Sequence, residues 1–507
     1  MISRVESFIL EGIDARACEI EVDLSSAQLP STTIVGLPDA SVRESIQRVR
    51  TAVCNSGYRY PRKRVTINLA PATVRKEGPV YDLPIAVALL AASGTIDPTT
   101  GDGRPQTGEF LIGGELALDG RIRPIKGVIS LTELARQRGK RGVIVPLANA
   151  AEAAVVDGVE VRGVRKLGEV VGMFNGRITV EPQPTTDIEA HRTTPAVDFA
   201  DIRGQEAAKR ALTIAAAGAH NILMIGPAGT GKTMMARALA GVLPPLSRAE
   251  ALEVTRIYSS VGQLPRDRPL VTERPVRTPH HTASAAAIVG GGSIPRPGEV
   301  SLAHCGVLFL DELPEFARDV LETLRQPLEE GWVTIARARG SVRFPARFMF
   351  VGALNPTPRG EMARDEVSQR AMEKYLAKIS RPLIDRIDIH IEVPAVAYKQ
   401  LVSRRRGTDT ATIRKRVLEA RRVQCRRQGP QTTNAQLSGG LLDQCVALDE
   451  ISQTLLGQAM TELGLSARAY DKIRRVARTI ADLDGSQNVA SHHISEGVQY
   501  RLLDRML

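Results

Sequence analysis

Residues 226–233 carry the strongest chemical signal in the sequence. They match the G-x-x-x-x-G-K-[ST] pattern of a phosphate-binding loop. The loop consists of Gly226, Pro227, Ala228, Gly229, Thr230, Gly231, Lys232 and Thr233. In such a loop, backbone N–H groups face a phosphate chain, the lysine reaches the β- and γ-phosphates, and the hydroxyl binds Mg²⁺. The sequence therefore predicts that this chain binds ATP and Mg²⁺, with Thr233 as a ligand of the ion.

Two carboxylates follow an apolar run about 80 residues after the phosphate loop. Residues 307–310 are Val-Leu-Phe-Leu, and Asp311 and Glu312 come directly after them. ATP hydrolysis needs one carboxylate for Mg²⁺ and one that polarises the attacking water. We predict the first role for Asp311 and the second for Glu312, as a general base.

A second apolar run, 348–354, ends at Asn355. In a parallel sheet this residue would lie beside the two carboxylates. It could then orient the attacking water and sense the γ-phosphate. The alternative is an asparagine that only forms a turn before Pro356. The residues alone leave both readings open.

The elements around these residues have the order that the chemistry requires. Residues 221–225 are apolar and short enough for a buried strand, and 234–242 are rich in Ala, Leu and Met, as in a helix. Strand, glycine turn and helix are the context of a phosphate loop. Strand-like and helix-like segments alternate over 200–395, which predicts an α/β core with the nucleotide at the carboxyl ends of parallel strands.

The rest of the chain divides on either side of this core. Residues 1–175 mix strand-like and helix-like segments, among them a strand at 65–69, a buried helix at 83–92 and a strand at 110–118, which predicts an α+β domain. Residues 176–199 are rich in Thr, Pro and acids, as in a linker. The sequence after this core, 396–507, is helical in pattern, with the clearest helices at 411–428 and 463–483.

Composition limits the class of protein. The chain has 507 residues, 43% hydrophobic and 24% charged, as in soluble globular proteins. No apolar stretch is long enough to span a bilayer and no signal peptide is evident, so we expect a cytoplasmic protein. The five cysteines form no C-x-x-C pair, which argues against a disulfide framework and a zinc site. The adjacent His280 and His281 are too few ligands for a metal beyond Mg²⁺.

Longer runs resemble a known family. The phosphate loop, the two strands with polar ends and residues 383–388 follow in the order of an AAA+ ATPase. Within that superfamily, the runs at 277–284, 290–299 and 308–316 resemble the magnesium-chelatase-like ComM family, also called YifB. The resemblance covers essentially the whole chain. It implies an ATPase that forms a homo-hexameric ring, with 396–507 as the helical lid and C-terminal magnesium-chelatase-like domain.

The resemblance also implies roles for single residues. Asn355 would be sensor 1, and Arg386 the arginine finger that reaches the ATP of a neighbouring subunit. Arg381 is a rival finger, but the family usually has glycine there. Arg468 would be sensor 2 on the lid, acting in cis or in trans. A planar, permanently charged guanidinium can neutralise charge that develops on the γ-phosphate. A finger supplied in trans would make the monomer a poor ATPase.

The N-terminal domain resembles the proteolytic, S5-like domain of Lon at 76–84 and 114–129. That domain uses a Ser–Lys dyad. Here Val80 stands at the serine position and Ile129 at the lysine position. Neither side chain can attack a carbonyl or accept a proton, so we expect no peptidase activity.

Basic residues suggest where nucleic acid could bind. Residues 333–344 alternate around a Gly340-Ser341 turn, as in a β-hairpin, and carry Arg337, Arg339 and Arg343 as possible DNA contacts. Residues 404–427 hold ten Lys or Arg against two acids, a balance of +8. Either segment could instead be a solvated surface.

The leading hypothesis is an ATP-driven DNA motor that promotes branch migration. It would bind branched or single-stranded DNA through the backbone, because aromatic residues make up only 4% of the chain. The alternatives are an ATPase subunit of magnesium-chelatase type and an AAA+ ATPase that remodels proteins.

Overall fold

The computed structural model describes residues 2–97, 105–186, 197–265, 268–292, 294–337, 340–355, 375–376, 378–396, 398, 407–501 and 504. The chain divides into two compact units. The first consists of Met1–Arg192 and Ser247–Thr272, and the second of Thr193–Leu246 and Glu273–Leu507. Among the described residues, no helix has both the length and the apolar character needed to cross a membrane.

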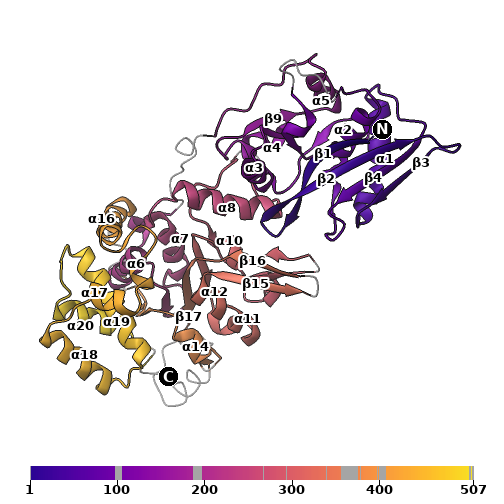
Figure 1. The fold of residues 1–507 in the computed structure, drawn as a ribbon. Coiled ribbons are helices and arrows are strands. Elements are labelled where there is room, and N and C mark those ends of the chain that lie inside the picture. The colour runs from indigo at the N-terminus through magenta and orange to yellow at the C-terminus, as the bar shows by residue number, and fades with distance from the viewer. Residues whose placement is uncertain are drawn as a thin grey trace. The chain divides into compact units, whose positions relative to one another are not determined.

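The first unit is built on a seven-stranded mixed sheet (Figure 1). Its strand order is β3-β4-β2-β1-β5-β8-β9; β1–β2 and β2–β4 are antiparallel, and the other pairs are parallel. The strands are β1 (Ile2–Glu11), β2 (Asp14–Ser25), β3 (Ser31–Val35), β4 (Arg64–Ala70), β5 (Phe110–Ile112), β8 (Gly142–Pro146) and β9 (Glu160–Val164), with a small hairpin of β6 (Glu115–Leu116) and β7 (Ile122–Arg123). Strand β4 confirms the strand predicted at 65–69. The strand predicted at 110–118 is divided into β5 and β6.

Six α-helices lie in the described part of the first unit. They are α1 (Ala40–Asn55), α2 (Asp82–Ala92), α3 (Val128–Gln137), α4 (Leu147–Ala153), α5 (Leu167–Phe174) and α8 (Arg248–Val261). Every residue of α2 is buried, which confirms the buried helix predicted at 83–92. Helices and a mixed sheet together make the α+β arrangement that the sequence predicts.

Helix α8 belongs to the first unit although it follows the phosphate-loop helix in sequence. The hydroxyl of Ser259 donates a hydrogen bond to the buried carboxylate of Glu152, at 2.5 Å, and the carbonyl of Ser259 accepts one from the N–H of Gly127. Burial raises the pKa of Glu152, against hydrogen bonds from Ser259 and Asn149 that lower it. A buried carboxyl group held by named donors ties α8 to this unit.

The second unit contains a five-stranded sheet in which every strand pair is parallel. The strand order is β11-β14-β17-β10-β18. The strands are β10 (Ile222–Ile225), β11 (Val276–Arg277), β14 (Val307–Leu310), β17 (Met349–Leu354) and β18 (Ile389–Glu392). Strands β10, β14 and β17 are buried along their whole length, as is typical of a parallel sheet covered on both faces. The predicted α/β core is confirmed.

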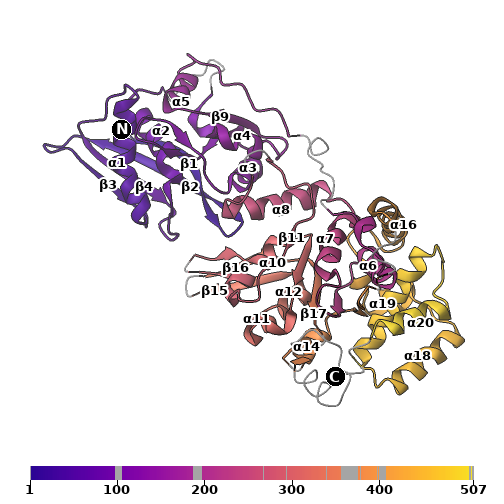
Figure 2. The same cartoon turned by 180° about the vertical axis from the view of Figure 1, so that it is seen from behind.

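Helices and two hairpins surround this sheet (Figure 2). The hairpins are β12 (Gly290–Gly291) with β13 (Arg296–Pro297), and β15 (Trp332–Arg337) with β16 (Gly340–Pro345). The helices are α6 (Glu206–Gly218), α7 (Lys232–Val242), α9 (Ala285–Val289), α10 (Glu299–Leu302), α11 (Arg318–Thr323), α12 (Arg325–Glu330) and α14 (Arg381–Ile384).

The C-terminal part of the second unit is helical, as predicted. Its helices, orange to yellow in Figure 1, are α16 (Thr410–Gln428), α17 (Gly439–Cys445), α18 (Glu450–Glu462), α19 (Ala467–Leu483) and α20 (Ser491–Gln499). Helix α19 begins four residues after the predicted start at 463, because the side chain of Ser466 caps it by accepting the Ala469 N–H.

Candidate functional site

The phosphate loop joins β10 to α7 as the sequence predicts. Gly229 and Gly231 have φ angles of +78° and +88°, a region that glycine adopts without steric cost. Helix α7 starts at Lys232, so its first N–H groups lie next to the loop. The partial positive charge of a helix N-terminus favours phosphate there.

Gly226 is required by packing. A Cβ atom at this position would lie 2.0 Å from the carbonyl oxygen of Val393, which follows β18. The Gly226 N–H donates to the carbonyl of Leu354 at the end of β17. The start of the loop is therefore held closely between the ends of two neighbouring strands.

Lys232 points into the loop. Its Nζ donates hydrogen bonds to the carbonyls of Gly226, at 2.6 Å, and Pro227, at 2.8 Å, and to Oδ1 of Asn355, at 3.1 Å. The residue is buried. Burial lowers the pKa of its ammonium group, and the negative charges of Asp311 and Glu312 oppose that shift.

Thr233 and Asp311 meet at the same edge of the sheet. The Thr233 hydroxyl donates to Oδ2 of Asp311 at 2.8 Å, and Oδ1 of Asp311 accepts the backbone N–H of Glu312 at 3.0 Å. The Thr233 hydroxyl and the Asp311 carboxylate thus offer two neighbouring oxygen ligands. A small divalent cation such as Mg²⁺ prefers oxygen ligands, so this pair suits it. The predicted phosphate, metal and sensor 1 residues are thus brought together at the ends of β10, β14 and β17.

Glu312 lies beside this group in a left-handed backbone conformation with φ +52°. Its side chain is half exposed, and Oε2 lies 3.4 Å from Nδ1 of His281. His281 follows β11, which pairs with β14 on the side away from β17. The sequence did not indicate this contact.

The two candidate arginine fingers differ in environment. The side chain of Arg386 is only 10% exposed; it pairs with Glu329 and donates to the carbonyl of Pro382. Arg381 is exposed and forms no ion pair with any residue in the described ranges. The role of Arg386 in a neighbouring subunit stays a prediction.

Arg468 lies in the first turn of α19 and is 67% exposed, and its Nη1 is 3.5 Å from Oδ2 of Asp385. One turn further along α19, Lys472 enters a buried polar cluster. Its Nζ contacts Oδ1 of Asp388 at 3.2 Å and donates to the carbonyl of Ile387 at 3.0 Å. Helix α19 is thereby attached to the segment that carries Arg386.

The other carboxylate oxygen of Asp388 faces His220 Nδ1 at 3.3 Å, and His220 Nε2 lies 2.8 Å from the hydroxyl of Thr479. Burial alone would raise the pKa of Asp388, but the charges of Lys472 and His220 outweigh it and hold this pKa below its usual range. Burial lowers the pKa of Lys472 to about 8. This cluster was not predicted, because its members are far apart in sequence.

The basic hairpin is present, but Gly340 and Ser341 are not its turn. Arg337 pairs with Gly340 and Ala336 with Ser341 in the strand register, so both residues belong to β16. Arg339 lies outside the described residues, as does the side chain of Arg337. Arg343 is exposed, and its guanidinium lies 5.2 Å from the ring centre of Trp332.

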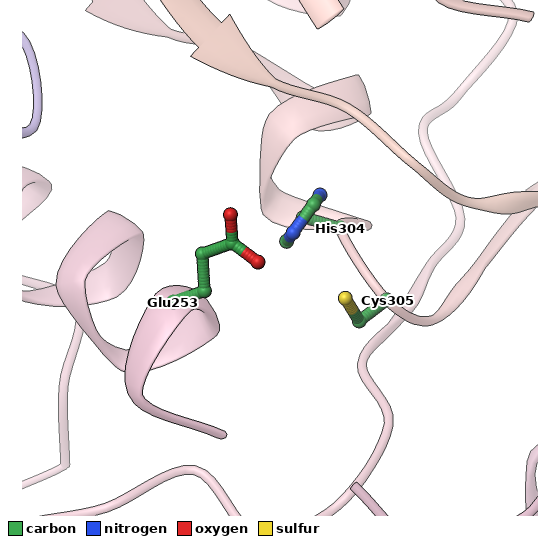
Figure 3. Close-up of side chains that lie close together, drawn as sticks. All are labelled: Glu253, His304 and Cys305. Carbon is green, nitrogen blue, oxygen red and sulfur yellow. The ribbon is translucent and has the colours of Figure 1, made fainter. Parts of the chain in front are cut away.

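Two histidines that could suggest metal ligands have structural roles. His304 and Cys305 precede β14 (Figure 3), and His304 Nδ1 accepts the N–H of Arg347 at 3.0 Å. His493 Nδ1 accepts the N–H of Ala490 at the start of α20, so its proton is on the other nitrogen. Each ring holds a backbone segment in place.

In the first unit, Val80 lies in a 3₁₀ turn at Pro79–Tyr81 and Ile129 is buried in α3.

In the second unit, α16 presents Lys415, Arg416, Arg422 and Arg426 to solvent. None of these four forms an ion pair with another described residue.

Comparisons with known proteins show what this chain is similar to. Three family models match: magnesium chelatase, subunit ChlI, at residues 198–401; subunit ChlI of Mg-chelatase at 20–149; and the ChlI C-terminal region at 407–501. Competence protein ComM of Haemophilus influenzae is 43% identical over 505 residues, which cover 98% of this chain and 96% of the relative. YifB of Escherichia coli is 42% identical with the same coverage, and the magnesium-chelatase 38 kDa subunit of Rhodobacter capsulatus is 27% identical over 62% of this chain and 89% of its own.

Proposed function

Because this chain belongs to the magnesium-chelatase-like ComM/YifB family of AAA+ proteins, we propose that it is an ATP-driven DNA motor that promotes branch migration in recombination. The family implies an ATPase with a ComM-like role. The DNA substrate, the hexameric ring and the use of ATP with Mg²⁺ are the further steps of the proposal.

One observation supports the ATPase chemistry above all others. Lys232 lies within hydrogen-bond distance of Asn355, and Thr233 within hydrogen-bond distance of Asp311, where the adjacent parallel strands β10, β14 and β17 end. Lys232 would bind the β- and γ-phosphates, while Thr233 and Asp311 would hold Mg²⁺. When bound, the ion would neutralise negative charge on the phosphates of ATP.

The water would be activated by Glu312 and oriented by Asn355. Glu312 would take a proton from the water as the water oxygen bonds to the γ-phosphorus, while the bond from that phosphorus to the bridging oxygen breaks and ADP leaves. Asn355 already contacts Lys232 at 3.1 Å, so its amide is close to where that phosphate would lie. Arg386 of one subunit would complete the site of the next, which requires an assembly of identical subunits such as the proposed ring.

Arg343 supports the DNA part of the proposal. It is exposed on β16, and it lies over Trp332 of the paired strand, which limits its conformations. A restrained arginine can contact phosphates along a DNA backbone with little dependence on sequence. Such binding weakens as salt rises, because cations released from DNA compete with the protein.

The test is the steady-state ATPase rate of the purified chain with and without branched or single-stranded DNA, at several salt concentrations. We expect stimulation by DNA that falls as salt rises. Arg343→Ala should reduce stimulation, whereas Arg318→Ala, which changes an exposed arginine on α11, should not. A rate indifferent to DNA would contradict the motor.

The ring has its own test. Glu312→Gln subunits mixed with Arg386→Ala subunits should recover part of the lost ATPase rate, since a mixed interface can combine an intact base with an intact finger. No recovery would argue against a finger that acts in trans.

A second candidate is an ATPase subunit of magnesium-chelatase type. The observation in its favour is that all three matching family models describe a magnesium chelatase subunit. This candidate predicts ATP hydrolysis that DNA leaves unchanged, so the same assay separates the two.

A further inference from the structure

Helix α16 carries a row of positive charges on its outward side. The helix packs against α6, α7 and α19. Its buried residues are Thr410, Ile413, Val417, Ala420 and Gln424. Since an α-helix has 3.6 residues per turn, the side chains of Lys415, Arg422 and Arg426 point in the opposite direction. All three are exposed, so they form a basic row along the helix.

The charge of the basic row is not neutralised by any residue in the described ranges. Glu419 lies four residues after Lys415 and three before Arg422, spacings at which opposite charges on a helix can meet. Its carboxylate nevertheless forms an ion pair with neither. Nearer the buried side of the same helix, by contrast, Arg427 pairs with the buried carboxylate of Asp482 at 2.7 Å. The fold therefore pairs an arginine of α16 where it meets the interior and leaves the outward charges to solvent or to a ligand.

The basic row has a length that suits a nucleic-acid backbone. At a rise of 1.5 Å per residue, the backbone positions of Lys415 and Arg426 lie about 16 Å apart along the helix axis. One strand of a duplex carries a phosphate about every 3.4 Å of its axis, so about five phosphates pass along this length. Three cations in a row can contact several of these phosphates at once, whereas a small anion would occupy only one cation.

The chemistry of the exposed side favours a duplex over a single strand. The exposed residues of α16 are Ala411, Thr412, Lys415, Arg416, Glu419, Arg422, Cys425 and Arg426. None of them is aromatic. Proteins that hold single strands combine positive charge with aromatic rings on which the bases stack. Cations without such rings suit a duplex, because its bases already stack on one another.

The basic row is separate from the hairpin that bears Arg343. In both Figure 1 and Figure 2, α7 and β17 lie between α16 and the β15–β16 hairpin. A branched DNA has more than one arm. The two surfaces can therefore contact different arms of the same molecule.

We propose that the basic row of α16 binds the phosphate backbone of a duplex arm of branched DNA. The contacts are made by Lys415, Arg422 and Arg426, and they hold the arm without reading its sequence. The proposal rests on the proposed function for the identity of the ligand. It adds to that function a second contact surface and the kind of DNA that this surface takes.

The experiment measures the affinity of the full-length chain for a duplex oligonucleotide by fluorescence anisotropy at several salt concentrations. Loss of one phosphate contact lowers the slope of log affinity against log salt by about 0.9. We expect this change from each of Lys415→Ala, Arg422→Ala and Arg426→Ala, with binding about five- to tenfold weaker at about 0.1 M salt. The triple variant should lose about three times as much slope.

The variants should remain folded, because alanine has the highest helix propensity and the three positions are exposed. Melting temperatures check this. Arg318→Ala, a change at an exposed arginine of α11, is the matched control and should leave the slope unchanged. A single strand of the same length should bind the triple variant nearly as well as the wild type. An equal loss of affinity for single strand and duplex would overturn the assignment of a duplex arm.

A crosslinking experiment locates the DNA directly. Cys425 and Cys54 are exposed cysteines, and Cys425 lies next to Arg426 on α16. A thiol-reactive photo-crosslinker on the Cys54→Ser protein should crosslink to the duplex through Cys425. In the matched control, Cys54→Ser and Cys425→Ser are combined with Gln458→Cys, which moves the label to the exposed side of α18. Crosslinking from both positions alike, or from neither, would contradict the placement on α16.

The outcomes separate this proposal from the DNA motor. If DNA stimulates the ATPase but the triple variant keeps the salt slope of the wild type, the basic row is overturned and the motor stands. If the triple variant loses slope but DNA leaves the ATPase rate unchanged, the basic row stands and the motor fails. Wild-type protein that binds no duplex overturns both. Polyglutamate that competes with the duplex at equal charge concentration would make this a surface for acidic proteins and overturn its assignment to DNA.

Discussion

Asp388→Asn should destabilise the second unit by about 3–5 kcal/mol, the usual result of removing one partner of a buried ion pair. Asp388 is buried, and its two oxygens lie 3.2 Å from Nζ of Lys472 and 3.3 Å from Nδ1 of His220. Lys472 keeps a hydrogen bond to the carbonyl of Ile387 at 3.0 Å. Since part of the ammonium group stays satisfied, we expect the lower half of that range.

The pH dependence of this loss has a definite sign. Burial lowers the pKa of Lys472 to about 8, even though Asp388 opposes the shift. Between that value and the unfolded value of about 10.4, the unfolded chain binds more protons, so the contribution of Lys472 to stability rises with pH. Without Asp388, the pKa of Lys472 in the folded protein falls further, so the stability of the variant begins to rise at a lower pH than that of the wild type. The difference in free energy of unfolding between the two proteins should therefore shrink as pH increases towards about 8.

At acidic pH the difference in stability should also shrink, for a different reason. The pKa of Asp388 is held below its usual range, so the wild type loses the contribution of this group as pH falls below about 4. Asp388→Asn has no such carboxylate to protonate. The difference in stability between the two proteins should narrow in acid as well as towards pH 8.

Urea denaturation followed by tryptophan fluorescence measures this loss. The chain has one tryptophan, Trp332, which lies in the second unit and reports on it alone. Asp443→Asn is the matched control, because Asp443 is 69% exposed and pairs with Arg474 of the same helix α19. The control should lose less than about 1 kcal/mol. A loss below about 1 kcal/mol for Asp388→Asn, or one that is equal at pH 6 and pH 8.5, would refute the reasoning.

Three further outcomes test the nucleotide site. Lys232→Ala should abolish ATP binding measured by calorimetry, and normal affinity would exclude the loop assignment. Gly226→Ala should weaken both ATP binding and thermal stability, because its Cβ atom would lie 2.0 Å from the Val393 carbonyl; Gly457→Ala on the exposed face of α18, with nothing within 4 Å, should be neutral or stabilising. Asn355→Ala should lower kcat about a hundredfold with a smaller change in ATP affinity, and an unchanged kcat would leave Asn355 as a turn residue only.

The parts of this site that the sequence predicted are those encoded by continuous segments. Strands β10, β14 and β17 are uninterrupted apolar runs, each followed at once by the residues with a chemical role. In a parallel sheet, that order alone places the residues at one edge. The positions of Lys232, Asp311 and Asn355 relative to one another followed without knowledge of any other part of the chain.

The parts that the sequence did not predict depend on contacts between distant segments. Strand β11 has only two residues, too few for a periodic pattern, so the contact of His281 with Glu312 had no local signal. Helix α8 is amphipathic, but nothing in its pattern tells which unit its apolar face will cover. The turn predicted at Gly340 and Ser341 was wrong, because glycine at 340 suggested a turn whereas Gly340 pairs with Arg337 in the strand register.

The side chains proposed to act on the γ-phosphate already have partners within their own chain. Lys232 is bound by two loop carbonyls, Glu312 contacts His281, and Arg386 pairs with Glu329. Each must exchange that partner for substrate before it can stabilise the transition state, and Arg386 must do so towards a neighbouring subunit. A single subunit offers no such exchange for Arg386. Slow hydrolysis by the monomer and faster hydrolysis in the assembled ring are thus expected from the same set of contacts.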